Sequence, residues 1–224
     1  MANYCTTFIT FHGDIKELRS FYNKLLQWTE TLAIVTDFGP GGLANILVHA
    51  GLKEYTGLDG NTENLVSCRG SIADIEDIDL NTYPDDTDTS FYIYVDSAWE
   101  PMLKMWDLIF KKLNYKTLHY SFMAEESGNN LYWIYDPYGD YTDDCYVTVY
   151  LDGDDAVDNK FDALYDLGPC TIESFVKVAQ ELLKTTESDA TKLAEKLNNY
   201  DFKSEKSFIS VDFYKKLSNL DHVA

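Results

Sequence analysis

The chain has 224 residues, of which 45% are hydrophobic, so it can build one sizeable core with or without an appended subdomain. Aromatic residues make up 15% of the chain. Burial can therefore offset the entropy lost on ordering, and the composition excludes a disordered acidic tail. The formal net charge is -20, which argues against direct binding to nucleic acid or to an anionic membrane, because both depend on clustered Lys and Arg.

The cysteines and the N-terminal segment indicate where in the cell the protein is expected. The spacing of Cys5, Cys68, Cys145 and Cys170 favours neither a secreted disulfide scaffold nor a zinc knuckle. Pairs brought together by the fold stay open, and we expect buried free thiols. No basic and apolar leader precedes the first strand-like segment, and no run reaches the roughly 20 apolar residues of a membrane span. We therefore expect a cytoplasmic protein without a signal peptide.

The N-terminal segment predicts a strand followed by a helix. Residues 4–11 are rich in β-branched and aromatic types, which is typical of a strand. Asp14 is expected to cap a helix over 15–27, with Glu17 as its capping-box partner, because apolar residues then recur at helical spacing. Residues 30–63 are Gly-rich and less periodic, and we interpret them as an insertion with short elements.

The middle of the chain predicts three strands and a helix. A strand is expected within 64–80, and residues 90–96 alternate between two faces. Pro101 suits the first position of a helix that continues to Leu113. Residues 116–124 predict the next strand.

A strand pair completes this part, with residues 131–135 and 145–151 joined by the turn-rich segment 136–140. The order up to 124 is strand, helix, strand, strand, helix, strand. This order indicates an α+β fold of the ferredoxin-like type, an antiparallel sheet with helices on one face.

The chain changes character after about residue 160, where nine Lys stand against eleven acids. Thr171 and Ser188 are predicted helix caps, and a third helix is expected around Phe213 and Leu217. We therefore predict two domains: residues 1–159, an α+β domain with an insertion at about 30–63, and residues 160–224, a helical C-terminal subdomain.

Negative charge is concentrated in the span 70–159, which holds 20 acids and 4 bases, a net of -16. Its two stretches 70–103 and 117–159 contain no Lys or Arg. Carboxylates at strand ends and turns could form a rigid array comparable to DNA, which carries about one charge per 1.7 Å of axis. The candidate partner-binding residues are Asp74, Glu76, Asp77, Asp79, Asp85, Asp86, Asp88, Asp136, Asp140, Asp143, Asp144, Asp152, Asp154, Asp155 and Asp158.

Simpler explanations of these acids compete with mimicry of nucleic acid. Asp is common in turns because it hydrogen-bonds locally, and a solvated acidic surface needs no partner. Halophilic adaptation would disperse acids over the whole surface, whereas the flanks of the span are near neutral. Mimicry and the solvated surface both stay open at this point.

The sequence matches no complete motif for catalysis or metal binding. The segment from Asp152 begins like a calcium loop, but Val157 and Ala163 stand where an EF-hand requires Gly and Glu. The glycines of 39–42 lack the Lys and Ser/Thr of a phosphate-binding loop. No two histidines among His12, His49, His119 and His222 have zinc-binding spacing. We predict no catalytic residue, metal or cofactor.

Two segments carry a family resemblance. They are the opening Met1-Ala2-Asn3-Tyr4-Cys5-Thr6-Thr7 with its strand to Gly13, and the stretch from Phe91 through Ser97-Ala98-Trp99-Glu100-Pro101 to Tyr120-Ser121-Phe122-Met123-Ala124-Glu125-Glu126-Ser127-Gly128-Asn129. Over roughly residues 1–150 the chain resembles the YubB-type ferredoxin-like domain of phages, plasmids and other mobile elements. It departs from that pattern at Tyr4, where Trp is usual, and at Glu100, where Pro or Ser is usual. The resemblance implies an α+β fold and a mobile-element context, and it supplies no catalytic residues.

Charge and resemblance together lead to one function and two alternatives. The leading hypothesis is a phage or mobile-element inhibitor of a host defence nuclease, of the anti-CRISPR or anti-restriction type, which binds the basic nucleic-acid cleft by mimicry. The first alternative is a non-enzymatic scaffold that uses aromatic and helical surfaces. The second is a hydrolase with a metal held by Asp clusters.

Overall fold

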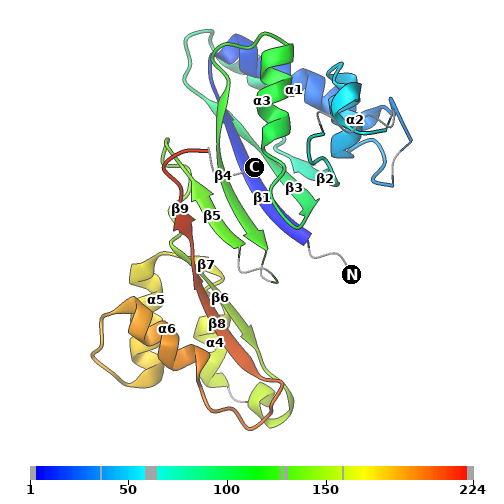
Figure 1. Ribbon diagram of the computed structural model, residues 1–224. Helices are drawn as coiled ribbons and strands as arrows, with labels where there is room; N and C mark the ends of the chain where they lie inside the picture. The colour runs from blue at the N-terminus through cyan, green and yellow to red at the C-terminus, as the bar shows by residue number, and fades with distance from the viewer. Residues whose placement is uncertain are drawn as a thin grey trace. The chain divides into compact units, whose positions relative to one another are not determined.

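The chain forms a mixed α and β structure with two sheets, which Figure 1 shows as a ribbon of the computed structural model. The structure describes residues 4–35, 37–58, 65–126, 128, 131–157 and 159–220. Contacts divide the chain into unit 1, residues 1–140 and 216–224, and unit 2, residues 141–215. The chain passes into unit 2 after Asp140, so the boundary predicted at 159 falls inside that unit.

Unit 1 is built on a sheet whose long strands follow the predicted segments closely. The strands are β1 (Tyr4–His12), β2 (Gly70–Ile75), β3 (Ser90–Ala98), β4 (His119–Glu126), β5 (Leu131–Tyr135) and β9 (Lys215–Lys216). Their order in the sheet is β2-β3-β1-β4-β5-β9. β1 pairs antiparallel with both β3 and β4, and the pairs β2–β3 and β4–β5 are antiparallel too.

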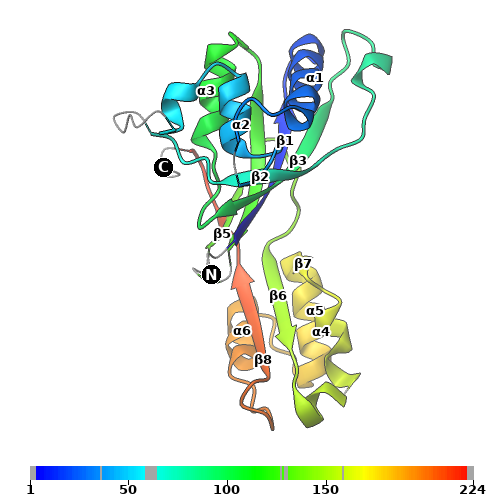
Figure 2. The same cartoon turned by 90° about the vertical axis from the view of Figure 1, so that its right-hand side faces the viewer.

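Three helices lie on one face of this sheet, as Figures 1 and 2 show. They are α1 (Ile15–Glu30), α2 (Leu43–His49) and α3 (Lys104–Lys112), with the 3₁₀ turns η1 (Lys53–Tyr55) and η2 (Leu80–Thr82) in the connections. Phe11 of β1 is fully buried, and its ring packs edge-on against Phe21 at 5.1 Å and Trp106 at 5.4 Å between ring centroids. Such aromatic contacts add to the burial energy that holds helices to the sheet.

The two predicted helix starts of unit 1 have different outcomes. The Asp14 side chain accepts a hydrogen bond from Lys16 N at 2.9 Å, so the predicted cap is confirmed. The predicted capping-box role of Glu17 is wrong, because its carboxylate accepts hydrogen bonds from Lys116 and Thr117 instead. The start predicted at Pro101 is wrong as well. α3 begins three residues later, because Leu103 N bonds Pro101 O in a tight turn at 3.1 Å.

The segment after α1 is tied to the core by one buried side chain. Asn45 of α2 is fully buried, and its Oδ1 accepts from Ala33 N at 2.8 Å. Its Nδ2 donates to the carbonyl oxygens of Trp28, Thr31 and Pro40. A single amide therefore satisfies several backbone groups between α1 and α2, in a segment that meets β2 where Ile72 N donates to Gly41 O at 2.9 Å.

Unit 2 has its own three-stranded sheet and its own core. Its elements are β6 (Cys145–Tyr150), η4 (Gly153–Val157), η5 (Asn159–Phe161), α4 (Asp162–Tyr165), β7 (Pro169–Cys170), α5 (Ile172–Leu183), α6 (Ala190–Asn198) and β8 (Phe208–Phe213). The strand order is β7-β6-β8, and both pairs are antiparallel. Phe175, Leu193 and Leu197 are fully buried against the apolar face of this sheet.

Unit 2 overturns three expectations. The strand at 145–151 exists, but it pairs with β7 and β8, whereas β5 pairs with β4. The helix predicted around Phe213 is a strand, because Ile209 and Val211 are buried while Ser210 and Asp212 face outward, a period of two. Thr171 caps α5 as predicted, but α6 is capped by Asp189 and not by Ser188. The C-terminal part is therefore not wholly helical.

None of the helices among the described residues combines the length and the apolar content that a membrane crossing requires.

We predict that Asn45→Ala lowers the free energy of unfolding by about 2–4 kcal/mol, because it leaves several buried backbone groups without partners. Urea unfolding monitored by tryptophan fluorescence measures this loss. The matched control is Asn81→Ala, at an exposed residue whose side chain bonds Asp79, and it should change stability by no more than about 0.5 kcal/mol. Equal effects of the two substitutions would contradict the assigned role of Asn45.

Candidate functional site

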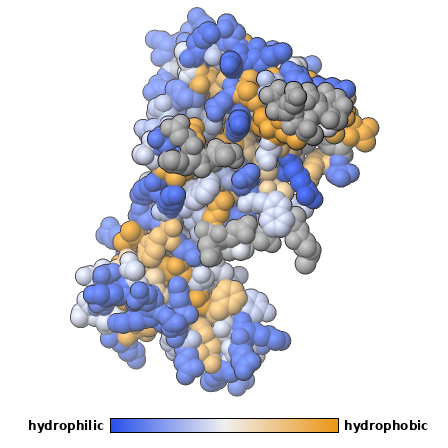
Figure 3. All heavy atoms as spheres, viewed as in Figure 1, coloured by the Kyte–Doolittle hydropathy of each residue, from blue (hydrophilic) through white to orange (hydrophobic). Residues whose placement is uncertain are grey.

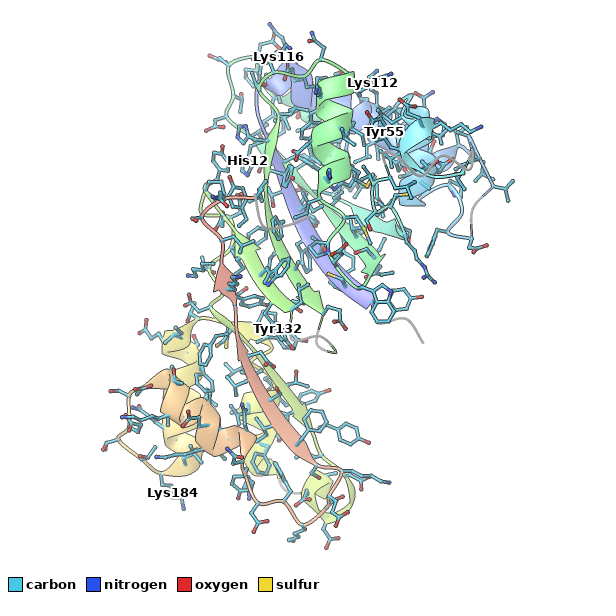
Figure 4. The ribbon with its side chains drawn as sticks, in the orientation of Figure 1. His12, Tyr55, Lys112, Lys116, Tyr132 and Lys184 are labelled. Carbon is cyan, nitrogen blue, oxygen red and sulfur yellow. The ribbon has the colours of Figure 1, made fainter. Side chains whose placement is uncertain are left out.

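Two histidines stand side by side where β1 ends and β4 begins. His12 and His119 are register partners in the antiparallel β1–β4 pair. Their rings are parallel within 5°, with centroids 5.7 Å apart. In Figure 4 His12 lies towards the upper end of the sheet and Tyr132 of β5 towards the lower end. The pairing of the two strands brings these imidazoles together, although they are far apart in sequence.

Tyr138 covers both imidazoles. Its ring centroid lies 4.5 Å from each of the two histidine rings. The turn that carries it is held by Asp136, whose Oδ1 accepts from Gly139 N and Asp140 N at 2.8 Å each. Gly139 has φ +81°, a backbone conformation that glycine adopts without strain.

Hydrogen bonds orient both histidine rings. His12 Nε2 lies 2.7 Å from Asp140 Oδ2, so Nε2 carries a proton and donates it to the carboxylate. His119 Nδ1 lies 2.6 Å from Thr117 O. Since a carbonyl only accepts, Nδ1 carries the proton and donates it to Thr117 O.

A network behind the histidines fixes Thr117. Glu17 of α1 accepts from Thr117 N at 2.9 Å and from Thr117 Oγ1 at 2.8 Å, and it also accepts from Lys116 N. Burial by itself raises the pKa of Glu17, but these hydrogen bonds outweigh it and hold the pKa below its usual range. The helix therefore tethers the loop that orients His119.

A cavity of about 600 Å³ opens beside this group. It is lined by His12, Gly13, Asp14, Asp88, Thr89, Ser90, Thr117, His119 and Tyr138. Gly13 is required here because a Cβ would lie 2.9 Å from Thr117 O, and its φ of +148° is unfavourable for other residues.

The groups around the cavity suit a positively charged ligand. Desolvation, followed by the nearby Tyr135 and Asp140, raises the pKa of the Tyr138 phenol. The arrangement offers aromatic faces and carboxylates, a combination that suits a cationic group.

Some predicted partner-binding acids of unit 1 meet at this cavity and others do not. Asp88 lines it, and Asp140 contacts it through His12. Asp85 instead binds Arg19 Nη1 at 2.7 Å and Lys16 Nζ at 3.3 Å. Hydrogen bonds from Arg19 and Lys16 hold the pKa of that carboxyl below its usual range.

Two further acids of unit 1 bond their own chain. Asp79 accepts from Asn81 N at 3.0 Å, and Glu76 accepts from Tyr92 N at 3.0 Å. Asp74, Asp77 and Asp86 are exposed and form no ion pair with any residue that the structure describes.

Three of the six predicted acids of unit 2 bond their own chain, namely Asp144, Asp152 and Asp155. Asp155 is only 8% exposed and accepts from Lys203 N, Ser204 N and Ser207 Oγ. The hydrogen bond from Ser204 N leads the interactions that lower the pKa of Asp155. This carboxylate is therefore buried and engaged by its own chain, unlike the exposed acids of unit 1.

The remaining acids of this unit differ in accessibility. Asp152 accepts from Ser204 Oγ at 2.9 Å, and Asp144 accepts from Ile172 N at 3.1 Å. Asp154 is exposed and Asp143 is half-buried. Asp158 lies outside the described residues.

Sequence patterns did not reveal the His12, His119 and Tyr138 cluster. Neither histidine has a partner at zinc-binding spacing. The available signal was positional, because His12 directly follows the predicted strand 4–11 and His119 lies in the first half of the predicted strand 116–124. In the part of the chain that the structure describes, no three His, Cys, Asp or Glu side chains are grouped so that they could hold a metal ion.

No protein-family model, no curated protein and no solved structure matches this chain.

We predict that Glu17→Gln makes the free energy of unfolding less dependent on pH in the acid range. A depressed pKa in the folded state contributes stability above the unfolded pKa, and this stability is lost as pH falls through the folded pKa. The loss on substitution near pH 7 should be about 1 kcal/mol, since the carboxylate is partly solvated. Urea unfolding at a series of pH values from neutral to acid measures it.

The control for that measurement is Asp86→Asn, at an exposed carboxylate without an ion pair in the described chain. It should leave the shape of the pH curve unchanged. If Glu17→Gln and the wild type lose stability in parallel as pH falls, the tether does not act as described.

Proposed function

We propose that this protein is a phage or mobile-element acidic interaction protein that binds a basic nucleic-acid-binding protein or nuclease of the host. It would inhibit that partner by occupying its nucleic-acid cleft, in the manner of anti-CRISPR or anti-restriction proteins. The observation that supports the proposal is the set of exposed carboxylates Asp74, Asp77, Asp86 and Asp88, which form no ion pair with any described residue. Asp74 lies in β2, and the other three lie in the connection from β2 to β3 of unit 1.

The connection from β2 to β3 is held in place by hydrogen bonds from α1. Arg19 of α1 donates from Nε to Leu80 O at 2.8 Å and from Nη2 to Tyr83 O. Its Nη1 bonds Asp85. The backbone just before Asp86 is therefore fixed by Arg19. Asp86 and Asp88 lose less conformational entropy when a partner binds than they would on a mobile loop. Hydrophilic side chains cover this upper end of unit 1 in the space-filling view (Figure 3).

The cavity beside His12 gives the acidic surface a place for a partner side chain. Asp14 and Asp88 line it, and Tyr138 supplies an exposed aromatic face. A lysine or arginine from a basic cleft would meet negative charge and a π-face at once. Repulsion among carboxylates would be relieved by such a partner, which favours binding over a purely solvated role.

The proposed surface is narrower than the sequence suggested. Both units are acidic by composition, with 22 acids and 10 bases in unit 1 and 16 acids and 8 bases in unit 2. The described acids of unit 2 include the buried Asp155 and two that bond their own chain. The proposal therefore rests on unit 1.

We also propose that unit 1 is a ferredoxin-like domain of the YubB type and that unit 2 is its C-terminal subdomain. The proposal is supported by the order β2-β3-β1-β4, in which α1 precedes β2 and α3 joins β3 to β4. Two helix-containing connections on one face of an antiparallel sheet are typical of a split βαβ arrangement.

A second candidate function is a scaffold that binds through aromatic surfaces. The observation in its favour is the stacked pair of Tyr150 and Phe208 in unit 2, whose ring centroids are 5.8 Å apart. Their exposed fractions are 50% and 48%. Exposed aromatics of this kind are enriched in protein interfaces. Binding through them would depend little on salt.

We predict that Asp86→Lys/Asp88→Lys weakens binding to a basic nuclease by roughly 10- to 100-fold at low salt. Wild-type affinity should fall by about 100-fold between roughly 50 and 200 mM salt, because several charge contacts release counterions together. Calorimetry or fluorescence anisotropy against a panel of nucleases with and without bound DNA measures both effects.

The matched control is Glu181→Lys/Glu205→Lys, which makes the same change in net charge within unit 2. It should retain most of the affinity. Tyr150→Ala/Phe208→Ala separates the second candidate function. If that variant loses binding while affinity is independent of salt, the scaffold is correct and the mimic is wrong.

A further inference from the structure

Cys145 and Cys170 face each other across β6 and β7 of unit 2. Their Cα atoms are register partners, and their Sγ atoms are 3.6 Å apart. Both are free thiols in the structure. The structure describes all four cysteines, and only these two lie in contact with each other. The distance is short enough that a small rotation of the side chains would allow a bond.

The backbone around the two sulfurs is held from several sides. Asp144 N donates to Cys170 O at 2.9 Å, and Val147 N donates to Gly168 O at 3.0 Å. Asp144 Oδ2 also accepts from Ile172 N, at the start of α5. β7 is therefore fixed against β6, and the sulfurs stay opposite each other.

We propose that Cys145 and Cys170 form a reversible thiol–disulfide site that hydrogen peroxide oxidises. Cα register and a hydrogen-bonded frame already supply the geometry of a cross-strand disulfide. No pattern of cysteine spacing signals this pair, because its two members are 25 residues apart in sequence. The proposal is independent of the function proposed for unit 1.

The two thiols have different roles in the reaction. Cys145 Sγ lies 3.6 Å from Cys170 Sγ and also 3.6 Å from Cys170 O, to which its thiol donates. The hydrogen bond between the two thiols lowers the pKa of Cys170 and raises the pKa of Cys145. Cys170 is 6% exposed and Cys145 is fully buried. Cys170 is thus the thiolate that meets the oxidant, because reactivity follows thiolate character and access.

The steps balance in atoms and electrons. The Cys170 thiolate attacks one peroxide oxygen, the O–O bond breaks, and the departing hydroxide takes up a proton to form water. Cys170 then carries a sulfenic acid. The Cys145 sulfur loses its proton and attacks the Cys170 sulfur, the S–O bond breaks, and a second water leaves. Two thiols lose two electrons, which reduce one peroxide to two waters.

The other two cysteines lack these features. Burial raises the pKa of Cys5 to about 11, and its sulfur contacts Thr7 Oγ1 at 3.7 Å. Burial also raises the pKa of Cys68. Neither has a second sulfur in contact that could resolve a sulfenic acid. They serve as internal references for the reaction.

The experiment treats the reduced full-length protein with stoichiometric hydrogen peroxide, alkylates the remaining thiols and maps tryptic peptides by mass spectrometry. Lys160 lies between the two cysteines, so trypsin separates them unless they are linked. We expect one linked peptide pair with two hydrogens lost, alkylated Cys5 and Cys68, and reversal by dithiothreitol. We also expect the Tm of unit 2 to rise by roughly 10 °C, since the bond closes a loop within that unit.

The variant Cys68→Ser should form the same link, and Cys170→Ser should not. The wild-type peptide map decides the matter even if Cys170→Ser fails to fold. Four alkylated thiols after peroxide treatment of the folded protein would overturn the proposal. So would a stable sulfinic acid on Cys170, or a link from Cys170 to Cys68 in place of Cys145.

Discussion

The pairing of β1 with strands on both of its edges is the constraint on which unit 1 depends. β1 hydrogen-bonds to β3 on one side and β4 on the other. Its alternation sends Phe11 into the core beneath α1 and α3 and sends His12 to the opposite face. A shift of one residue in either pairing would exchange these roles, expose an aromatic ring and separate the two histidines. The core and the candidate site are therefore two consequences of one register.

Carboxylates in this protein serve two competing purposes. Some complete the fold, as Asp136 does for the turn that carries Tyr138 and Asp155 does for the loops of unit 2. Others, such as Asp86 and Asp88, stay at the surface. The first group gains hydrogen bonds that offset desolvation, whereas the second gains nothing from the described chain and adds repulsion. That difference in energy separates structural acids from those that a basic partner would stabilise.

The two units are built on separate hydrophobic cores, and the chain passes into unit 2 after Asp140 and leaves it after Lys215. The core of unit 1 contains Phe11 and Trp106, and that of unit 2 contains Phe175 and Leu193. β6 has the same alternation as a strand of unit 1, yet its apolar face closes the second core. Contacts across β6 also create the Cys145–Cys170 pair. Assigning a strand to its sheet thus decides which side chains meet.

Local patterns in the sequence were sufficient for most elements of the fold. Period-two alternation and helical spacing placed β1, β3, α1 and α5 close to their observed limits, and Asp14 and Thr171 were recognised as caps from their neighbours alone. Such features depend on residues a few positions apart, so a single sequence contains them. Composition also established the acidic character of the chain.

Long-range pairing decided the rest. The partners of β6, the meeting of His12 with His119 and the contact of Cys145 with Cys170 all join residues that no local pattern relates. Tertiary structure likewise divided the acids, because a carboxylate becomes structural only when distant N–H groups point at it, as Ser204 does towards Asp155. Local sequence determines which elements form, and the free energy of packing them together determines which side chains become neighbours.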